Sequence, residues 1–190
     1  MKNIILFASG SGSNAENIAA YFADNNNVNV KAVYTNNANA GVIERMKKFN
    51  IPCYVFSRAN FQDEQYFLSL LQEQQADLIV LAGFLWLIPS YLVKAYPNAI
   101  INIHPALLPK FGGKGMYGMH VHEAVKNAGE TETGITIHYV TEAYDEGEPI
   151  FQAKASLSDN DTPDSIAHKI HELEMANFPK VIEGLLQKMS

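Results

Sequence analysis

The chain has a single cysteine, Cys53, among its 190 residues. It therefore forms no intrachain disulfide and lacks the cysteine cluster of a zinc site, a composition that suits a reducing compartment. No apolar run approaches the roughly 18 residues of a membrane-spanning helix, and the start of the chain, Met1-Lys2-Asn3-Ile4, lacks a signal-peptide pattern. We therefore expect no membrane segment and a cytoplasmic location.

Positive charge is also scarce. Lys and Arg number 14 against 20 Asp and Glu, the formal net charge is −6, and no run of five basic residues occurs. We therefore expect no nucleic-acid partner, and a compact anionic substrate would have to bind to local backbone donors rather than to a positive field. The hydrophobic content of 47% and the charged content of 18% are typical of a globular protein, and the length predicts one domain over residues 1–190.

The first half of the chain alternates between apolar runs and amphipathic segments. We predict strands over residues 4–8, 28–34, 53–56, 78–82 and 99–103, separated by helices over residues 15–23, 40–49, 62–75 and 89–96. The continuous apolar runs fit strands that are buried on both faces, and alternation with short connections predicts right-handed crossovers. The expected fold class is therefore α/β, a single-domain doubly wound (Rossmann-like) sheet that is mostly parallel.

The pattern changes after Pro109. Residues 111–118 are rich in glycine, and a short helix is predicted over residues 120–128. Residues 133–140 and 152–156 have the pattern of two strands across a turn, so we expect this C-terminal portion of the sheet to be antiparallel. Thr162-Pro163-Asp164 then caps a final helix, with proline at the first helical position.

The stretch from Ile100 to Pro109 combines a buried strand with two polar side chains. Pro105 removes a backbone donor and keeps His104 extended. Asn102 and His104 are two residues apart, so both point to the same side of the strand, at the end where open α/β sheets bind ligands. A lone histidine is more often a structural hydrogen bonder. An amide inside an apolar strand, however, costs about 1–3 kcal/mol unless its hydrogen bonds are met, which favours a functional pair.

The loop after the first strand, Gly10-Ser11-Gly12-Ser13-Asn14-Ala15, matches the dinucleotide-binding pattern G-x-G-x-x-G/A. That pattern requires an acidic residue about 20 positions further on, whereas this chain has Tyr34-Thr35-Asn36-Asn37 there. We therefore interpret the loop as a cradle for a single phosphate group, in which backbone N–H groups approach the anion and Ser13 and Asn14 add donors. The alternative is an ordinary strand-to-helix turn with an asparagine cap.

Three other features each have a functional and a structural interpretation. Asp145 is either a solvated residue of an acidic turn or the partner that raises the pKa of His104. Residues 84–88 are either core or the wall of an apolar pocket for a flat ligand. His120 and His122 are two apart on a predicted helix and do not face each other, so we expect no metal site.

The stretch Asn102-Ile103-His104-Pro105-Ala106-Leu107-Leu108-Pro109 resembles the N-x-H-P-S-L-L-P signature of formyltransferases that use 10-formyltetrahydrofolate. The resemblance covers the whole chain, including the Gly12-Ser13-Asn14 loop, Leu81-Ala82-Gly83-Phe84 and the stretch from Gly134 to Asp145. It implies that residues 1–190 are a formyltransferase domain with 10-formyltetrahydrofolate as co-substrate. The short length and the phosphate loop favour the amine of 5-phosphoribosylglycinamide, a purine precursor, as the formyl acceptor.

The same resemblance implies roles for individual residues. Asn102 and protonated His104 would stabilise the oxyanion of the reaction, and Asp145 would hold and charge His104. The implied substrate-binding residues are Gly12, Ser13, Asn14 and Glu174, and the implied folate-binding residues are Leu85, Trp86, Leu87, Ile88, Asn102, Thr141 and Asp145. The chain departs from the family at Trp86, where members often have a basic residue, and in the longer loop of residues 112–119.

Two alternatives remain open at this point. The first is another folate-dependent formyltransferase or hydrolase of the same family, and the second is a non-catalytic nucleotide-binding module. In each case we expect small molecules as ligands, no metal, no nucleic acid and no membrane, and a chain that is a monomer or a homodimer.

Overall fold

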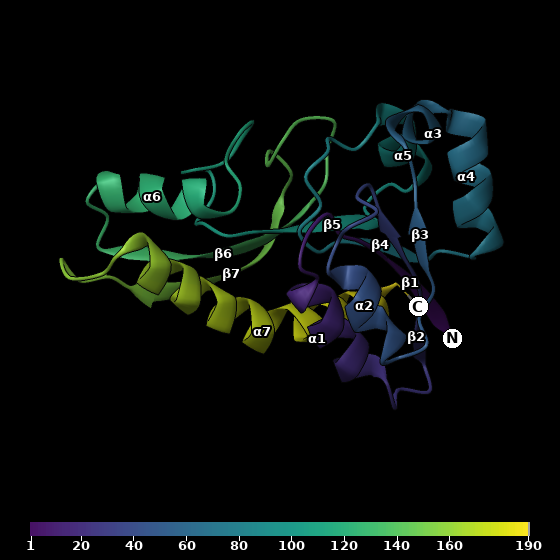
Figure 1. Ribbon diagram of the computed structural model, residues 1–190, viewed down its shortest axis with the longest axis horizontal. Helices are drawn as coiled ribbons and strands as arrows, with labels where there is room; N and C mark the ends of the chain where they lie inside the picture. Colours follow the sequence, from purple (N-terminus) through teal and green to yellow (C-terminus); the bar gives the residue numbers. More distant parts are fainter. Residues whose placement is uncertain (190) are drawn as a thin grey trace.

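Seven strands form one mixed sheet in the computed structural model, which describes residues 1–189 (Figure 1). The strands are β1 (Lys2–Phe7), β2 (Val28–Thr35), β3 (Cys53–Val55), β4 (Leu78–Leu81), β5 (Ile100–His104), β6 (Glu132–Tyr139) and β7 (Pro149–Ser156). Their order across the sheet is β3-β2-β1-β4-β5-β6-β7. The strands β1 to β5 pair in parallel, whereas β6 runs antiparallel to both β5 and β7. The predicted fold class, with its antiparallel C-terminal portion, is confirmed.

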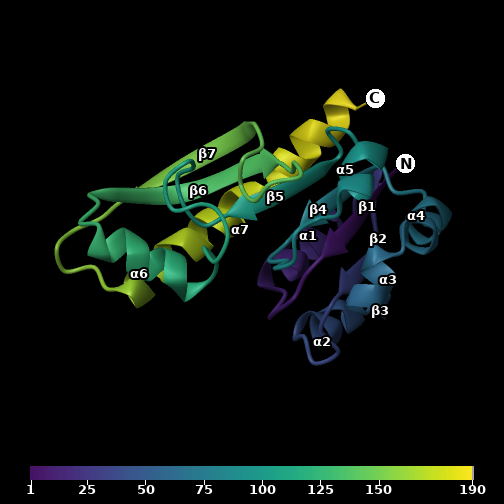
Figure 2. The ribbon, with the colours of Figure 1, turned by 90° about the horizontal axis from the view of Figure 1, so that it is seen from above.

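The helices cover both faces of this sheet. One core contains residues of α1 (Ser13–Phe22), α2 (Val42–Lys47), α6 (Met119–Asn127) and α7 (Pro163–Lys188), and the other contains residues of α3 (Arg58–Gln62), α4 (Glu64–Glu73) and α5 (Ser90–Ala95). Figure 2 shows α6 at the β6–β7 end of the molecule and α4 at the opposite end. Within residues 1–189, no helix combines the length and the apolar character that crossing a membrane requires.

The strand β1 explains why central strands appear as continuous apolar runs. Ile4 and Leu6 belong to the core on one face of the sheet, and Ile5 and Phe7 belong to the core on the other. All four side chains are fully buried. Because successive side chains of a strand point to opposite faces, a strand covered on both sides buries consecutive apolar side chains in both cores.

The helix predicted over residues 62–75 is wrong at its start. The structure has a separate short helix, α3, before α4, and the break lies at Asp63, whose backbone is extended. The side chain of Asp63 accepts a hydrogen bond from the Tyr66 amide and so begins a new helix. A second missed signal was Ser57, which forms a capping box with Asn60.

The last strand begins at Pro149 rather than at the predicted Gln152. Because β7 lies at the edge of the sheet, next to β6, a proline that donates no hydrogen bond is tolerated there.

The carboxyl ends of β1 and β4 lie next to each other where the strand order reverses. The chain winds from β1 towards β3 in one direction and from β4 towards β7 in the other. At such a switch point the loops that leave adjacent strands diverge, and a crevice opens above the strand ends. The carboxyl end of β5, with Asn102 and His104, borders the same crevice.

Gly12 is the position in the first loop where the backbone demands glycine. Its φ is +78°, and an added Cβ would lie 2.5 Å from the Cβ of Val42. The strained backbone and the clash each cost on the order of 1–3 kcal/mol. Gly12→Ala should therefore lower the free energy of unfolding by about 2 kcal/mol or more, measured by urea denaturation. Gly10→Ala is the matched control, because no atom lies within 4 Å of its added Cβ. Equal stability of the two variants would contradict this account.

Candidate active site

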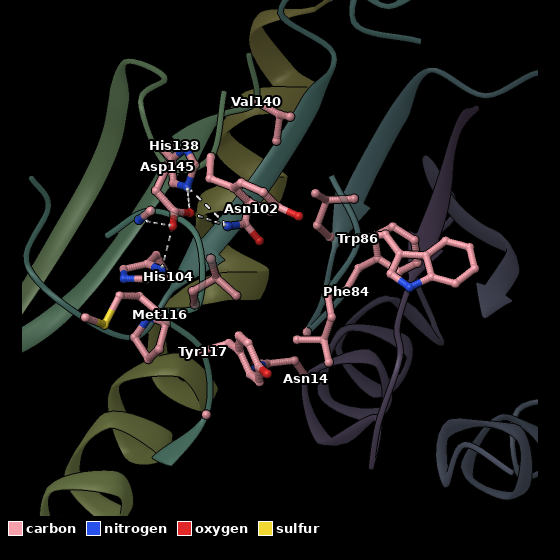
Figure 3. A pocket seen from close by; sticks show the side chains of 18 of the residues that line it. Asn14, Phe84, Trp86, Asn102, His104, Met116, Tyr117, His138, Val140 and Asp145 are labelled. Carbon is pink, nitrogen blue, oxygen red and sulfur yellow. Dashed lines mark hydrogen bonds and ion pairs between the residues drawn. The ribbon is translucent and has the colours of Figure 1, made fainter. Parts of the chain in front are cut away.

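A cavity of about 770 Å³ lies above the carboxyl ends of β1, β4 and β5 (Figure 3). Its wall is formed by the loop after β1, the segment after β4, the end of β5, the glycine-rich loop, the segment after β6, and one side each of α6 and α7. Segments far apart in the sequence therefore meet at the switch point of the sheet. A cavity of this size and place is where α/β folds bind small molecules.

Asn102 and His104 both line this cavity, as their spacing predicted. The antiparallel pairing of β6 with β5 places His138 directly opposite Asn102. The Asn102 Nδ2 atom lies 3.2 Å from His138 Nε2 and 3.5 Å from Asp145 Oδ1. With this orientation the two N–H groups of the Asn102 amide face an imidazole and a carboxylate. A flipped amide would instead turn its oxygen towards the carboxylate.

His138 is a site residue that the sequence reasoning missed. It is buried in β6, its Nδ1 donates a hydrogen bond to the Tyr139 carbonyl oxygen at 2.9 Å, and its Nε2 faces both Asn102 Nδ2 and Asp145 Oδ1. The signal in the sequence was a polar alternation, because Thr136 and His138 interrupt an otherwise apolar strand two residues apart. Thr136 has a structural role, since its hydroxyl donates to the Ala106 carbonyl oxygen at 2.7 Å.

His104 and Asp145 are neighbours, as predicted, with Nδ1 and Oδ2 3.5 Å apart. The His104 Nε2 donates to the Phe111 carbonyl oxygen at 2.8 Å, which assigns a proton to Nε2. The expectation that Asp145 raises the pKa of His104 above its ordinary value is corrected. Burial lowers the pKa of His104, and Asp145 and the Phe111 carbonyl offset that effect only in part.

Asp145 is held in place by its backbone and by its partners. Its φ is +55°, an uncommon conformation for a residue other than glycine, and its Oδ2 accepts a hydrogen bond from the Gly113 amide at 3.0 Å. Burial acts to raise the pKa of Asp145, but His138, His104 and the Gly113 amide outweigh burial and lower it. The carboxyl group is therefore ionised at neutral pH and faces the imidazoles of both histidines.

One half of the cavity is polar and lies on the side of α1 and α7. The Asn14 Nδ2 donates to Glu174 Oε2 at 2.9 Å, and the Asn14 Oδ1 atom is buried without a hydrogen-bond partner. Burial raises the pKa of Glu174 to about 7, against the opposing effect of Asn14. Ser11 and Asn14 line the cavity, whereas Gly12 and Ser13 are absent from its wall. Gly12 instead shapes the turn before α1, and Ser13 begins the helix.

The other half of the cavity is apolar. Leu85, Trp86, Leu87 and Ile88 all line the cavity, as does Thr141. Ile88 is also part of the core, so this apolar run contributes both to the core and to the wall of the cavity. The Trp86 ring packs edge-on against the Phe56 ring. The Arg58 guanidinium lies 4.3 Å from the centre of the Trp86 ring. A cation therefore lies beside the Trp86 ring at the apolar wall of the cavity.

The two histidines of α6 have different surroundings. His120 is exposed and lies 3.9 Å from Glu123, whereas His122 is buried and lines the cavity. Within residues 1–189, no group of three His, Cys, Asp or Glu side chains is arranged to hold a metal ion.

Known proteins resemble this chain in sequence and in structure. Residues 2–182 match the model of the formyl transferase family. Phosphoribosylglycinamide formyltransferase of Bacillus subtilis is 38% identical over 98% of this chain and 95% of that protein. The chloroplastic phosphoribosylglycinamide formyltransferase of Arabidopsis thaliana is 37% identical over 98% of this chain, which spans only 66% of that relative.

A solved structure agrees with these matches. Phosphoribosylglycinamide formyltransferase from Bacillus halodurans superposes with a TM-score of 0.88 at 34% identity, covering 100% of this chain and 97% of that chain. The chain belongs to the formyl transferase family.

Proposed function

We propose that this chain transfers the formyl group of 10-formyltetrahydrofolate to the amine of 5-phosphoribosylglycinamide. The observation that carries the proposal is that Asn102, His104 and Asp145 line the same cavity as the polar pair Asn14 and Glu174 and the apolar residues 85–88. A phosphorylated sugar suits the polar half, and a flat pterin suits the apolar half. The relatives that cover this chain almost end to end are named for this reaction.

The chemistry needs one proton to move between two nitrogen atoms. The amine attacks the formyl carbon, a C–N bond forms, and the carbonyl oxygen becomes an oxyanion. The bond from carbon to the folate nitrogen then breaks, and the proton lost by the amine is transferred to that nitrogen. His104 is largely neutral at rest because its pKa is lowered, so its Nδ1 can accept the proton from the amine and deliver it to the folate nitrogen. Asp145 stabilises the imidazolium that forms in between.

Asn102 is proposed to stabilise the oxyanion. Its amide already makes a 3.2 Å contact with His138 and a longer, 3.5 Å contact with Asp145. The longer contact is the weaker one, and a developing oxyanion can replace it while His138 keeps the amide in orientation.

The substrates are proposed to divide the cavity between them. The phosphate would bind to backbone N–H groups of residues 10–14 at the start of α1, where the helix dipole favours negative charge. Glu174 would accept hydrogen bonds from the sugar, and the pterin would lie between residues 85–88 and Thr141. The proposal includes a cytoplasmic location, which the near absence of cysteine suits.

The direct test is to mix the protein with 5-phosphoribosylglycinamide and 10-formyltetrahydrofolate and to follow the deformylated folate by absorbance. We expect turnover only when both substrates are present. Deformylation without the ribonucleotide would identify a hydrolase. Binding of the ribonucleotide without any turnover would identify a nucleotide-binding module.

The role of Asp145 predicts a large effect of removing its charge. Asp145→Asn keeps the shape but no longer stabilises the imidazolium, so kcat should fall more than tenfold at neutral pH. Since Asp145 raises the pKa of His104, the variant should have an even lower pKa there, and the limb of the pH–rate profile that reports His104 should move to lower pH. Titration of the His104 ring by NMR measures the shift directly.

Glu146→Gln is the control for Asp145→Asn, because it removes the charge of an exposed neighbour. An unchanged His104 pKa in Asp145→Asn, or an equal loss of activity in the control, would remove Asp145 from this role.

The raised pKa of Glu174 predicts that the affinity for the ribonucleotide depends on pH. Its pKa is about 7, so the carboxyl group is ionised above that pH and protonated below it. Only the ionised form accepts hydrogen bonds with both oxygens, and KM for the ribonucleotide should therefore rise as the pH falls through about 7. Glu174→Gln should weaken binding by about 1–3 kcal/mol and abolish this pH dependence.

In Glu174→Gln the KM for formyl folate should stay near its normal value. Glu172→Gln, at an exposed position on the same helix, is the control. If the ribonucleotide KM keeps its pH dependence in Glu174→Gln, another group is responsible for it.

A further inference from the structure

His122 is a buried polar side chain in the cavity that the proposed mechanism does not use. Its exposed fraction is 6%, it lies on α6, and it lines the cavity. Its Nδ1 atom is buried and has no hydrogen-bond partner. Within residues 1–189, Asn14 is the one other cavity-lining residue with a buried side-chain atom that lacks a hydrogen-bond partner. An unpaired polar atom in a preformed cavity indicates a contact that a ligand completes.

The surroundings of His122 assign it to one half of the cavity. Its helix, α6, packs against α7 and shares a core with α1. The α7 residues that line the cavity include Ile170, His171 and Glu174. The apolar wall of Trp86 and Ile88 belongs to the core on the opposite face of the sheet. His122 therefore lies in the half with Asn14 and Glu174, where the formyl acceptor is proposed to bind.

The charge state of His122 limits the kind of group it can bind. Burial lowers its pKa, and a charged His104 lowers it further. The ring is therefore neutral at neutral pH, with one N–H group and one lone pair. A neutral imidazole binds an uncharged polar group by a hydrogen bond. It would not serve as the cation that holds a phosphate.

Two other roles for His122 fit the geometry less well. A metal site would need further ligands, and within residues 1–189 no suitable group of three exists. A purely structural role would leave Nδ1 paired with the protein, as in His138, where Nδ1 donates to the Tyr139 carbonyl oxygen. His122 and His138 are both buried and both line the cavity, and of the two only His138 has its Nδ1 paired with the protein.

We propose that His122 is a substrate-binding residue of the acceptor half, whose Nδ1 makes a hydrogen bond to an uncharged polar group of the ribonucleotide, either its carboxamide or a sugar hydroxyl. The contact holds the acceptor amine beside His104. This inference rests on the proposed function, because it takes 5-phosphoribosylglycinamide as the acceptor.

The test exploits the shapes of two amide side chains. Asparagine places a polar atom close to the position of Nδ1, whereas glutamine places one close to that of Nε2. His122→Leu should raise the Kd of 5-phosphoribosylglycinamide about tenfold, the effect of one lost hydrogen bond of about 1.4 kcal/mol. His122→Asn should restore most of the affinity and His122→Gln little of it. The Kd of formyl folate should stay within about twofold throughout.

Titration calorimetry with each ligand alone gives these constants without requiring turnover. His120→Leu is the matched control, because it replaces an exposed histidine of the same helix. Ribose 5-phosphate distinguishes the two candidate groups. A similar loss of affinity for ribose 5-phosphate in His122→Leu assigns the contact to a hydroxyl, and an unchanged affinity assigns it to the carboxamide.

Several results would overturn the inference. Normal ribonucleotide affinity in His122→Leu would mean that Nδ1 contacts only water. Rescue by glutamine instead of asparagine would exclude Nδ1 as the contact. Equal losses for both ligands, with a lowered Tm, would indicate a structural residue. Failure of the unmodified protein to bind the ribonucleotide would instead refute the proposed function, so the two failures are distinguishable.

Discussion

The arrangement of the site depends on one largely buried carboxylate. Asp145 lies within 3.5 Å of side-chain nitrogen atoms of His104, His138 and Asn102, and it accepts a hydrogen bond from the Gly113 amide. These partners come from β5, β6 and the glycine-rich loop. A buried ion is stable only when its partners satisfy it, so the carboxylate requires all of these segments to be in place. The charge of the site and the packing of its loops therefore depend on each other.

The backbone around Asp145 supports that position. Asp145 adopts a positive φ of +55°, and a Cβ added to Gly147 would lie 1.6 Å from the Tyr139 carbonyl oxygen. The turn after β6 is therefore packed tightly against the end of that strand and has little freedom to move the carboxylate away from His104. Burial lowers the pKa of His104 and Asp145 offsets that effect only in part, so the imidazole is neutral at rest and its Nδ1 lone pair is available to accept a proton.

The division of the cavity follows from the sheet. Strand side chains alternate between two cores, and the helices that complete each core bring different side chains to the strand ends. α1, α6 and α7 supply Asn14, His122 and Glu174 on one side, and the segment after β4 supplies the apolar wall on the other. Asn102 and His104, on β5, line the same cavity. A reaction that transfers a group between a polar molecule and a flat apolar one can use a cavity with both kinds of wall.

The sequence by itself determined the parallel sheet, the antiparallel C-terminal portion and the common side of Asn102 and His104, because these depend on local periodicity and on chain geometry. It also indicated the pairing of Asp145 with His104 through the family signature. The break at Asp63 and the part played by His138 were missed, although a capping residue and a polar alternation were present. Only the tertiary structure decided that His138 faces Asn102, that Asn14 contacts Glu174 and that His122 has an unpaired nitrogen in the cavity. It also reversed the expected direction of the His104 pKa, because desolvation depends on how deeply a group is buried, and burial is set by segments that are remote in the sequence.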